Sequence, residues 1–110
     1  MPVDRPKVLF VCSRNEWRSR TAENIWRTDD RLTVRSAGTS RRARVRVTEA
    51  LLDWADIVFV MEEAHRRQLR ERFGQDATAN LIVLDIPDEY QYMDTELVNE
   101  LRDVVAPYLE

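Results

Sequence analysis

The chain alternates short apolar runs with longer stretches in which apolar residues recur every three or four positions. Short apolar runs bounded by polar residues indicate strands, whereas the wider spacing indicates helices with one buried face. We therefore expect four strands, at residues 7–12, 32–36, 57–61 and 80–86, and four helices, at residues 18–29, 48–55, 62–73 and 94–109. Strands separated by helices imply right-handed crossovers and a parallel sheet.

Local signals support several of these boundaries. Thr48 is a typical helix N-cap residue, and Gly74 is a typical residue just past a helix end. Residues 57–61 and 80–86 show no apolar–polar alternation, which predicts strands buried on both faces. The pattern predicts an α/β fold: a small four-stranded parallel sheet flanked by helices on both faces, with a ligand crevice beyond the carboxyl ends of the strands.

Composition narrows the class of protein. A length of 110 residues with 44% hydrophobic content predicts a single domain over residues 1–110. The formal net charge of −3 gives no reason to expect nucleic acid binding. No apolar stretch is long enough for a bilayer, and the first residues lack the apolar core of a signal peptide, so we expect a cytoplasmic protein without a membrane partner. One cysteine and one histidine leave no zinc-like cluster, and we expect no metal or cofactor; the oligomeric state stays open.

The sole cysteine, Cys12, ends the first expected strand, and Arg18 follows six positions later. Five intervening residues suffice for a loop that curls around a tetrahedral anion, because backbone N–H groups, a helix N-terminus and an arginine fork all bind phosphate oxygens. The same field favours the thiolate form of a cysteine. On spacing alone a buried packing role for Cys12 stays open, since the chain holds 17 Lys and Arg residues and such a match arises by chance.

A candidate acid follows the fourth expected strand, where the chain reads Asp85-Ile86-Pro87-Asp88-Glu89-Tyr90. Thiolate attack on a phosphate monoester needs a proton for the leaving oxygen and then a base to activate water, and one carboxyl group can serve both steps. Turns after strands are also rich in Asp for local hydrogen bonding, so position alone leaves both interpretations open.

Four segments resemble, in the same order, the signatures of low-molecular-weight protein tyrosine phosphatases. Residues 11–19 read VCSRNEWRS, followed by Thr21-Ala22-Glu23, and resemble the phosphate loop of that family. Ser36-Ala37-Gly38-Thr39 and residues 55–61, ADIVFVM, resemble its second-strand and third-strand regions. Pro87-Asp88-Glu89-Tyr90 is similar to its Asp-Pro-Tyr acid loop.

The resemblance implies a three-layer sandwich and assigns roles to residues. Cys12 would be the nucleophile, Arg18 would bind the phosphoryl oxygens, and Asp88 would act as acid and then base. Asp88 is preferred to Asp85 because it reproduces the Asp-x-Tyr spacing after a proline. Phosphate or substrate binding falls to Ser13, Arg14, Asn15, Glu16, Trp17, Ser19 and Tyr90, with Asn15 holding the loop in a left-handed backbone, Ser19 donating to the thiolate and Tyr90 lining the crevice wall.

The departures from the family pattern concern the mouth of the site. Arg14 replaces a glycine, and Glu16 replaces an apolar residue, where a carboxylate repels an anion unless an arginine pairs with it. The segment between Thr39 and Thr48 is short, which predicts a more open crevice. Five arginines lie in or near this segment: Arg35, Arg41, Arg42, Arg44 and Arg46. They either recruit an anionic partner or form a solvated charged loop.

We therefore expect a metal-independent cysteine phosphatase that acts on a phosphorylated protein, with phosphotyrosine as the default, or on a small phosphate monoester. One alternative is arsenate reduction on the same loop through an external small thiol. Another is a non-catalytic phosphate-binding regulatory module, with Arg14 and Glu16 as signs of a drifted loop. We expect His65 to be structural, since the pattern does not place it beyond the strand ends.

Overall fold

The computed structural model describes residues 5–109 and has the expected alternation of strands and helices. In chain order its elements are β1 (Lys7–Cys12), α1 (Arg18–Trp26), β2 (Thr33–Gly38), α2 (Glu49–Trp54), β3 (Ile57–Val60), α3 (Glu63–Phe73), β4 (Leu81–Val83) and α4 (Thr95–Val105). Two short 3-10 helices, Asp76–Thr78 and Ala106–Tyr108, precede β4 and follow α4. The predicted α/β class and order of elements are confirmed.

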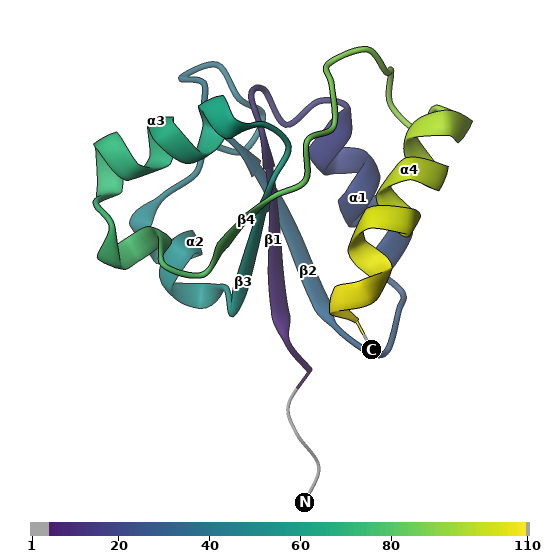
Figure 1. Cartoon of the computed structure of the whole chain (residues 1–110), viewed down its shortest axis with the longest axis horizontal. Helices are drawn as coiled ribbons and strands as arrows, with labels where there is room; N and C mark the ends of the chain where they lie inside the picture. Colours follow the sequence, from purple (N-terminus) through teal and green to yellow (C-terminus); the bar gives the residue numbers. More distant parts are fainter. Residues whose placement is uncertain (1–4, 110) are drawn as a thin grey trace, which may run out of the picture.

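The four strands form one parallel sheet in the order β2-β1-β3-β4. Figure 1 shows α1 and α4 on one side of this sheet and α2 and α3 on the other, which makes the expected three-layer sandwich. Successive residues of a strand point to opposite faces. Phe10 and Cys12 accordingly face the α1/α4 side, and Leu9 and Val11 face the α2/α3 side.

Aromatic stacking organises the core on the α1/α4 side. The ring of Phe10 lies 5.4 Å from that of Trp26 in α1 and 5.3 Å from that of Phe59 in β3. Leu97, Leu101 and Val105 of α4 complete this cluster as fully buried side chains. Stacked aromatic pairs of this kind add stability beyond their buried area. The strand that leads to Cys12 is therefore packed tightly on its α1/α4 face.

The fourth strand departs from the sequence expectation. β4 covers only Leu81–Val83, and its three side chains are half-buried, whereas we expected a fully buried strand over residues 80–86. Its edge position in the sheet explains this, because one flank has no further strand to cover it. The apolar pattern was correct for Leu84 and Ile86, which are buried but lie in the following loop.

The remaining differences are shifts of element ends. β2 extends to Gly38, two residues past the expected end, because it pairs with β1 as far as Cys12. α1 ends at Trp26, and α4 gives way to a 3-10 turn around Pro107, where proline cannot continue the helical hydrogen bonding. Thr48 caps α2 by accepting from the Leu51 N–H, as predicted.

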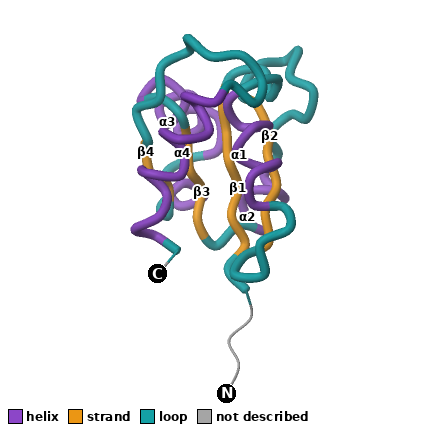
Figure 2. Tube along the Cα trace, turned by 90° about the vertical axis from the view of Figure 1, so that its right-hand side faces the viewer, coloured by secondary structure: helices purple, strands orange, loops and turns teal. Residues whose placement is uncertain are grey.

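The topology creates a crevice at one end of the sheet. The chain leaves β1 for β2 on one side and later returns to β3 on the other, so the loops after β1 and β3 diverge at the strand ends, where open α/β sheets bind ligands. Figure 2 shows these loops gathered at one end of the strands, opposite the end at which β1 begins. Within residues 5–109 no helix has both the length and the apolarity needed to cross a membrane.

Candidate active site

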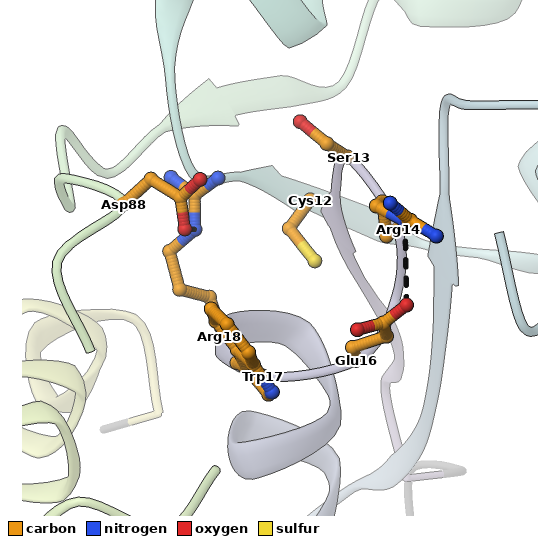
Figure 3. A pocket seen from close by; sticks show the side chains of 7 residues that line it. All are labelled: Cys12, Ser13, Arg14, Glu16, Trp17, Arg18 and Asp88. Atoms are coloured by element: carbon orange, nitrogen blue, oxygen red, sulfur yellow. Dashed lines mark ion pairs between the residues drawn. The ribbon is translucent and has the colours of Figure 1, made fainter. Parts of the chain in front are cut away.

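The loop between β1 and α1 encloses a hollow of about 260 Å³. Figure 3 shows the Cys12 sulfur pointing into it from the end of β1, with Arg18 and Asp88 on one side. The hollow is lined by Cys12, Ser13, Arg14, Glu16, Trp17, Arg18 and Asp88. Cys12 is the last residue of β1, four residues come from the loop, Arg18 is the first residue of α1, and Asp88 reaches in from the loop after β4. The structure therefore brings together the thiol, the guanidinium and the carboxyl group that the sequence singled out.

Asn15 holds the turn of this loop. Its backbone has a φ of 57°, in the left-handed region, as the resemblance implied. The buried amide nitrogen Nδ2 donates to the Ser19 hydroxyl at 2.7 Å and to the Ser36 hydroxyl at 2.9 Å. These two bonds join the loop to α1 and to β2, so the curvature around Cys12 is set by side chains as well as by backbone.

A directed chain of hydrogen bonds ends at the thiol. The Glu23 carboxylate can only accept, so the Ser36 hydroxyl donates to it and must itself accept from Asn15. Asn15 donates its other hydrogen to Ser19, whose hydroxyl hydrogen can go to the Cys12 sulfur 3.0 Å away or to the Ala37 backbone oxygen 3.4 Å away, and the sulfur is the nearer of the two. A hydroxyl that donates to sulfur stabilises the thiolate, which is the role expected for Ser19.

Arg18 is buried, with 2% of its surface exposed, and its guanidinium is positioned from two sides. Nη1 donates to Glu62 Oε2 at 2.5 Å and to the Ile86 backbone oxygen at 2.8 Å. Nε lies 3.7 Å from Asp88 Oδ1. These contacts fix the plane of the fork beside the thiol, which is the arrangement needed to hold two phosphoryl oxygens.

Sequence reasoning missed Glu62 and misplaced His65. Both lie where β3 meets α3, because α3 begins at the carboxyl end of β3. The Glu62 N–H donates to His65 Nδ1 at 3.1 Å, so the ring proton sits on Nε2, which donates to the Ser13 hydroxyl at 2.9 Å. His65 thus has the structural role expected for it, but it does lie beyond the strand ends, where it supports the loop between β1 and α1. The available signal was its position just after a central strand.

The pKa of His65 is lowered to about 4. Burial is the largest cause, since only 2% of the residue is exposed, and the positive charge of Arg18 acts in the same direction. The carboxylates of Glu62 and Asp88 oppose the shift. His65 is therefore neutral at neutral pH and can keep its acceptor nitrogen on the Glu62 N–H.

The loop after β4 separates the two candidate acids. Asp88 lines the hollow, whereas Asp85, exposed and with a φ of 58°, is not among the lining residues. Tyr90 was expected to line the crevice wall, and this expectation is wrong. Its hydroxyl donates to Glu100 Oε1 of α4 at 2.9 Å, a bond that raises the pKa of Tyr90 to about 12, and its ring packs against the core. Trp17, 43% exposed, is the aromatic residue at the mouth.

The two unusual mouth residues neutralise each other. Arg14 Nε lies 3.2 Å from Glu16 Oε1, the ion pair drawn dashed in Figure 3. Both side chains are about half exposed, so the pair contributes little to stability. Its effect is on the charge of the site. The Glu16 carboxylate would repel an anion, but Arg14 pairs with it, which is the condition that the sequence implied for an anion to bind here.

The short segment after β2, residues 39–47, runs along the outer edge of the loop between β1 and α1. The Ser40 and Arg44 N–H groups donate to the Ser13 and Arg14 carbonyl oxygens at 2.8 and 3.0 Å. Gly38 makes this approach possible, since a Cβ there would lie 2.5 Å from the Ser13 oxygen and 2.7 Å from the Ala43 Cβ. The segment thus supports the loop from outside rather than walling the hollow.

Solved structures with the same fold include several phosphatases. SP-PTP, a low-molecular-weight protein tyrosine phosphatase from Streptococcus pyogenes, superposes with a TM-score of 0.80 at 18% identity, covering 94% of this chain and 91% of that one. This chain has the low-molecular-weight protein tyrosine phosphatase fold. Vibrio vulnificus Wzb, solved with benzylphosphonate, gives a TM-score of 0.76 at 22% identity, with 96% and 97% of the two chains covered.

The low-molecular-weight phosphatase fold is not confined to one substrate. The YwlE arginine phosphatase from Geobacillus stearothermophilus gives a TM-score of 0.72 at 22% identity, covering 94% of this chain and 90% of that one. No protein-family model and no curated protein sequence matches this chain. The likeness confirms the fold that the motifs implied, and the argument for chemistry rests on the geometry around Cys12.

Proposed function

We propose that the chain is a cysteine-dependent phosphatase that hydrolyses phosphate monoesters without a metal ion. The observation that carries this proposal is the convergence of Cys12, Arg18 and Asp88 on one hollow, with a hydroxyl donor 3.0 Å from the sulfur. A nucleophile, an anion-binding fork and a proton donor are the three groups that the reaction requires. Hydrogen bonds position Cys12 and Arg18, and the Asp88 carboxylate lies 3.7 Å from Arg18 Nε.

The reaction proceeds in two balanced steps. The Cys12 thiolate attacks phosphorus and forms an S–P bond while the ester P–O bond breaks, and Asp88 in its acid form gives its proton to the departing oxygen. The Asp88 carboxylate then takes a proton from water, whose oxygen attacks phosphorus and releases phosphate and the thiolate. Arg18 and the loop's backbone N–H groups stabilise the charge on the phosphoryl oxygens in both steps.

The preferred substrate is phosphotyrosine in a protein. Neighbours of this fold are named tyrosine phosphatases, and the exposed indole of Trp17 at the mouth offers a face for an aromatic ring. Tyr90 does not supply a second aromatic wall, so the ring would be held from one side. Because one neighbour is named an arginine phosphatase, the substrate comparison must include phosphoarginine.

The decisive experiment measures hydrolysis of p-nitrophenyl phosphate against pH, with a chelator present. We expect turnover by the native chain, loss of turnover in Cys12→Ser and Arg18→Ala, and a kcat about 10²-fold lower in Asp88→Asn. Asp85→Asn is the matched control, because it removes a carboxyl group from the same loop outside the hollow, and its kcat should match the native value.

Three outcomes would contradict the proposal in different ways. Equal losses in Asp85→Asn and Asp88→Asn would remove Asp88 as the specific acid. Hydrolysis of a phosphoarginine peptide but of no aryl phosphate would contradict both the tyrosine assignment and the monoester specificity, and would leave a cysteine-dependent phosphatase that cleaves a P–N bond. Absence of turnover on either substrate by a folded chain that binds phosphate would favour a non-catalytic phosphate-binding module.

A further inference from the structure

A second hollow of about 200 Å³ lies beside α1 and shares no lining residue with the Cys12 hollow. It is lined by Arg20, Glu23, Asn24, Arg27, Arg44 and Tyr92. Three segments distant in sequence form it: α1 with its C-cap residue Arg27, the 39–47 segment through Arg44, and the loop after β4 through Tyr92. A hollow built from three segments is a candidate binding site rather than the side of one helix.

The charge of this hollow is strongly positive in a chain whose formal net charge is −3. Arg20 and Arg27 are exposed, and within residues 5–109 neither makes an ion pair. The only carboxylate in the lining, Glu23, accepts the hydroxyl hydrogen of buried Ser36 and has Arg44 Nη2 at 3.8 Å. Three guanidinium groups therefore face one carboxylate that already has partners inside the molecule.

Two of the three arginines are positioned before any ligand arrives. The Arg44 N–H donates to the Arg14 carbonyl oxygen at 3.0 Å, and its Nε donates to the Asn15 carbonyl oxygen at 3.3 Å. The Arg20 guanidinium lies over the Tyr92 ring, 4.7 Å from its centre. A fixed guanidinium loses less conformational entropy on binding, which favours affinity.

We propose that this hollow is a second anion site, which binds a tetrahedral oxyanion of the phosphate type, apart from the Cys12 centre. Guanidinium forks bind phosphate oxygens in pairs, and three forks supply more donors than a single carboxylate can accept. Among the residues of the basic segment, Arg44 thus has a binding role, whereas Arg35 lies over the Trp54 ring, 4.4 Å from its centre. The anion is either free phosphate or a second phosphoryl group on the same substrate.

The binding test uses calorimetric titration with inorganic phosphate at constant ionic strength, and it does not depend on turnover. We expect two binding events for the native chain and one for Arg20→Gln/Arg27→Gln, whose second site is weakened by at least about tenfold, as loss of a charge-assisted hydrogen bond implies. The control Arg67→Gln/Arg70→Gln removes the same charge from the exposed surface of α3 and should keep both events.

Arg18→Ala distinguishes the two sites, because it should abolish phosphate binding at the Cys12 centre only. This variant should keep the binding event at the second hollow, which Arg20→Gln/Arg27→Gln loses. A single event in the native chain that disappears in Arg18→Ala would overturn the proposal. Equal weakening in Arg67→Gln/Arg70→Gln would overturn it as well, because the effect would then come from total charge. All four substituted residues are exposed, on a helix or at its C-cap, so the native chain and these variants suffice even if Arg18→Ala does not fold.

A second arm identifies the source of the anion, using a peptide with phosphotyrosine alone and one that also carries a phosphoserine. A kcat/KM gain of about tenfold for the doubly phosphorylated peptide, lost in Arg20→Gln/Arg27→Gln but kept in the α3 control, would assign the site to the substrate. Two phosphate-binding events without such a gain would assign it to the free ion. The absence of both phosphate binding at the second hollow and a kcat/KM gain for the doubly phosphorylated peptide would refute the site itself.

Discussion

His65 makes the unfolding free energy depend on pH in a defined window. Its pKa is about 4 in the folded chain, against about 6.5 for an exposed histidine. Between these values the unfolded chain binds more protons than the folded one, so the free energy of unfolding rises with pH from 4 to 6.5 and this contribution is complete above 6.5. A shift of this size corresponds to on the order of 3 kcal/mol.

The assay compares urea unfolding of the native chain and of His65→Gln from pH 4 to 7. Carboxylates titrate in both proteins, so the difference between the two free energies isolates the histidine. We expect that difference to grow in favour of the native chain by about 3 kcal/mol across the window. Glutamine keeps a polar group of similar reach at the site, which limits the loss of packing.

Because the chain contains one histidine, its imidazole proton signal can be followed by NMR without assignment of other residues. A titration midpoint near 4 would agree with the buried ring between Glu62 and Ser13. A midpoint near 6.5, together with parallel stability curves for the native chain and His65→Gln, would refute both the burial of the ring and its contact with the phosphate loop.

Three further predictions concern the same loop. Gly38→Ala should lower the free energy of unfolding by about 1–3 kcal/mol and weaken phosphate binding, because the added Cβ would lie 2.5 Å from the Ser13 backbone oxygen. The control Gly74→Ala places a Cβ in open space at a residue with a φ of 90°, so it should lower stability without affecting phosphate binding. Urea unfolding and phosphate titration measure the two effects. Glu62→Gln should tighten phosphate binding several-fold in competition assays by removing the charge that neutralises Arg18, and weaker binding would contradict that role. Asn15→Ala should cost about 2–3 kcal/mol and slow alkylation of the thiol by iodoacetate several-fold, because two hydrogen bonds are lost; an unchanged rate would argue against the directed chain that ends at the sulfur.

Much of the fold could be predicted because its signals are local. The run that ends at Cys12 and the buried run over Ile57–Val60 are strands, and Thr48 and Gly74 mark helix ends through their own side-chain or backbone preferences. The failure at β4 has a physical cause. An apolar run indicates that its residues are buried, but it does not show whether they are buried as part of a strand or as part of a loop. At this sheet edge the strand ends at Val83, and Leu84 and Ile86 are buried in the loop that follows.

In the candidate site, too, the residues with local sequence signals could be predicted, and those positioned by long-range contacts could not. The placement of Cys12 and Arg18 follows from their short-range spacing around one anion, and that of Asn15 follows from the resemblance of the whole loop to the family signature. The partnership of Glu62 with Arg18 joins residues 44 positions apart, and no local pattern reports it. The prediction that Tyr90 lines the crevice was wrong for a related reason. Its position in the motif suggested the crevice, but its hydroxyl donates to Glu100 on α4, a contact that no local pattern reports.

The central position of β1 also determines how protection from hydrogen exchange changes along the chain. Leu9 and Val11 pair with both β2 and β3 and are fully buried, so their amides should exchange only when the whole chain unfolds. One residue past Cys12 the ladder ends, and exchange there can proceed by local opening of the phosphate loop. Cys12 thus sits at the border between two exchange regimes, and a phosphate-dependent slowing confined to residues 13–18 would report the order that an anion brings to the loop.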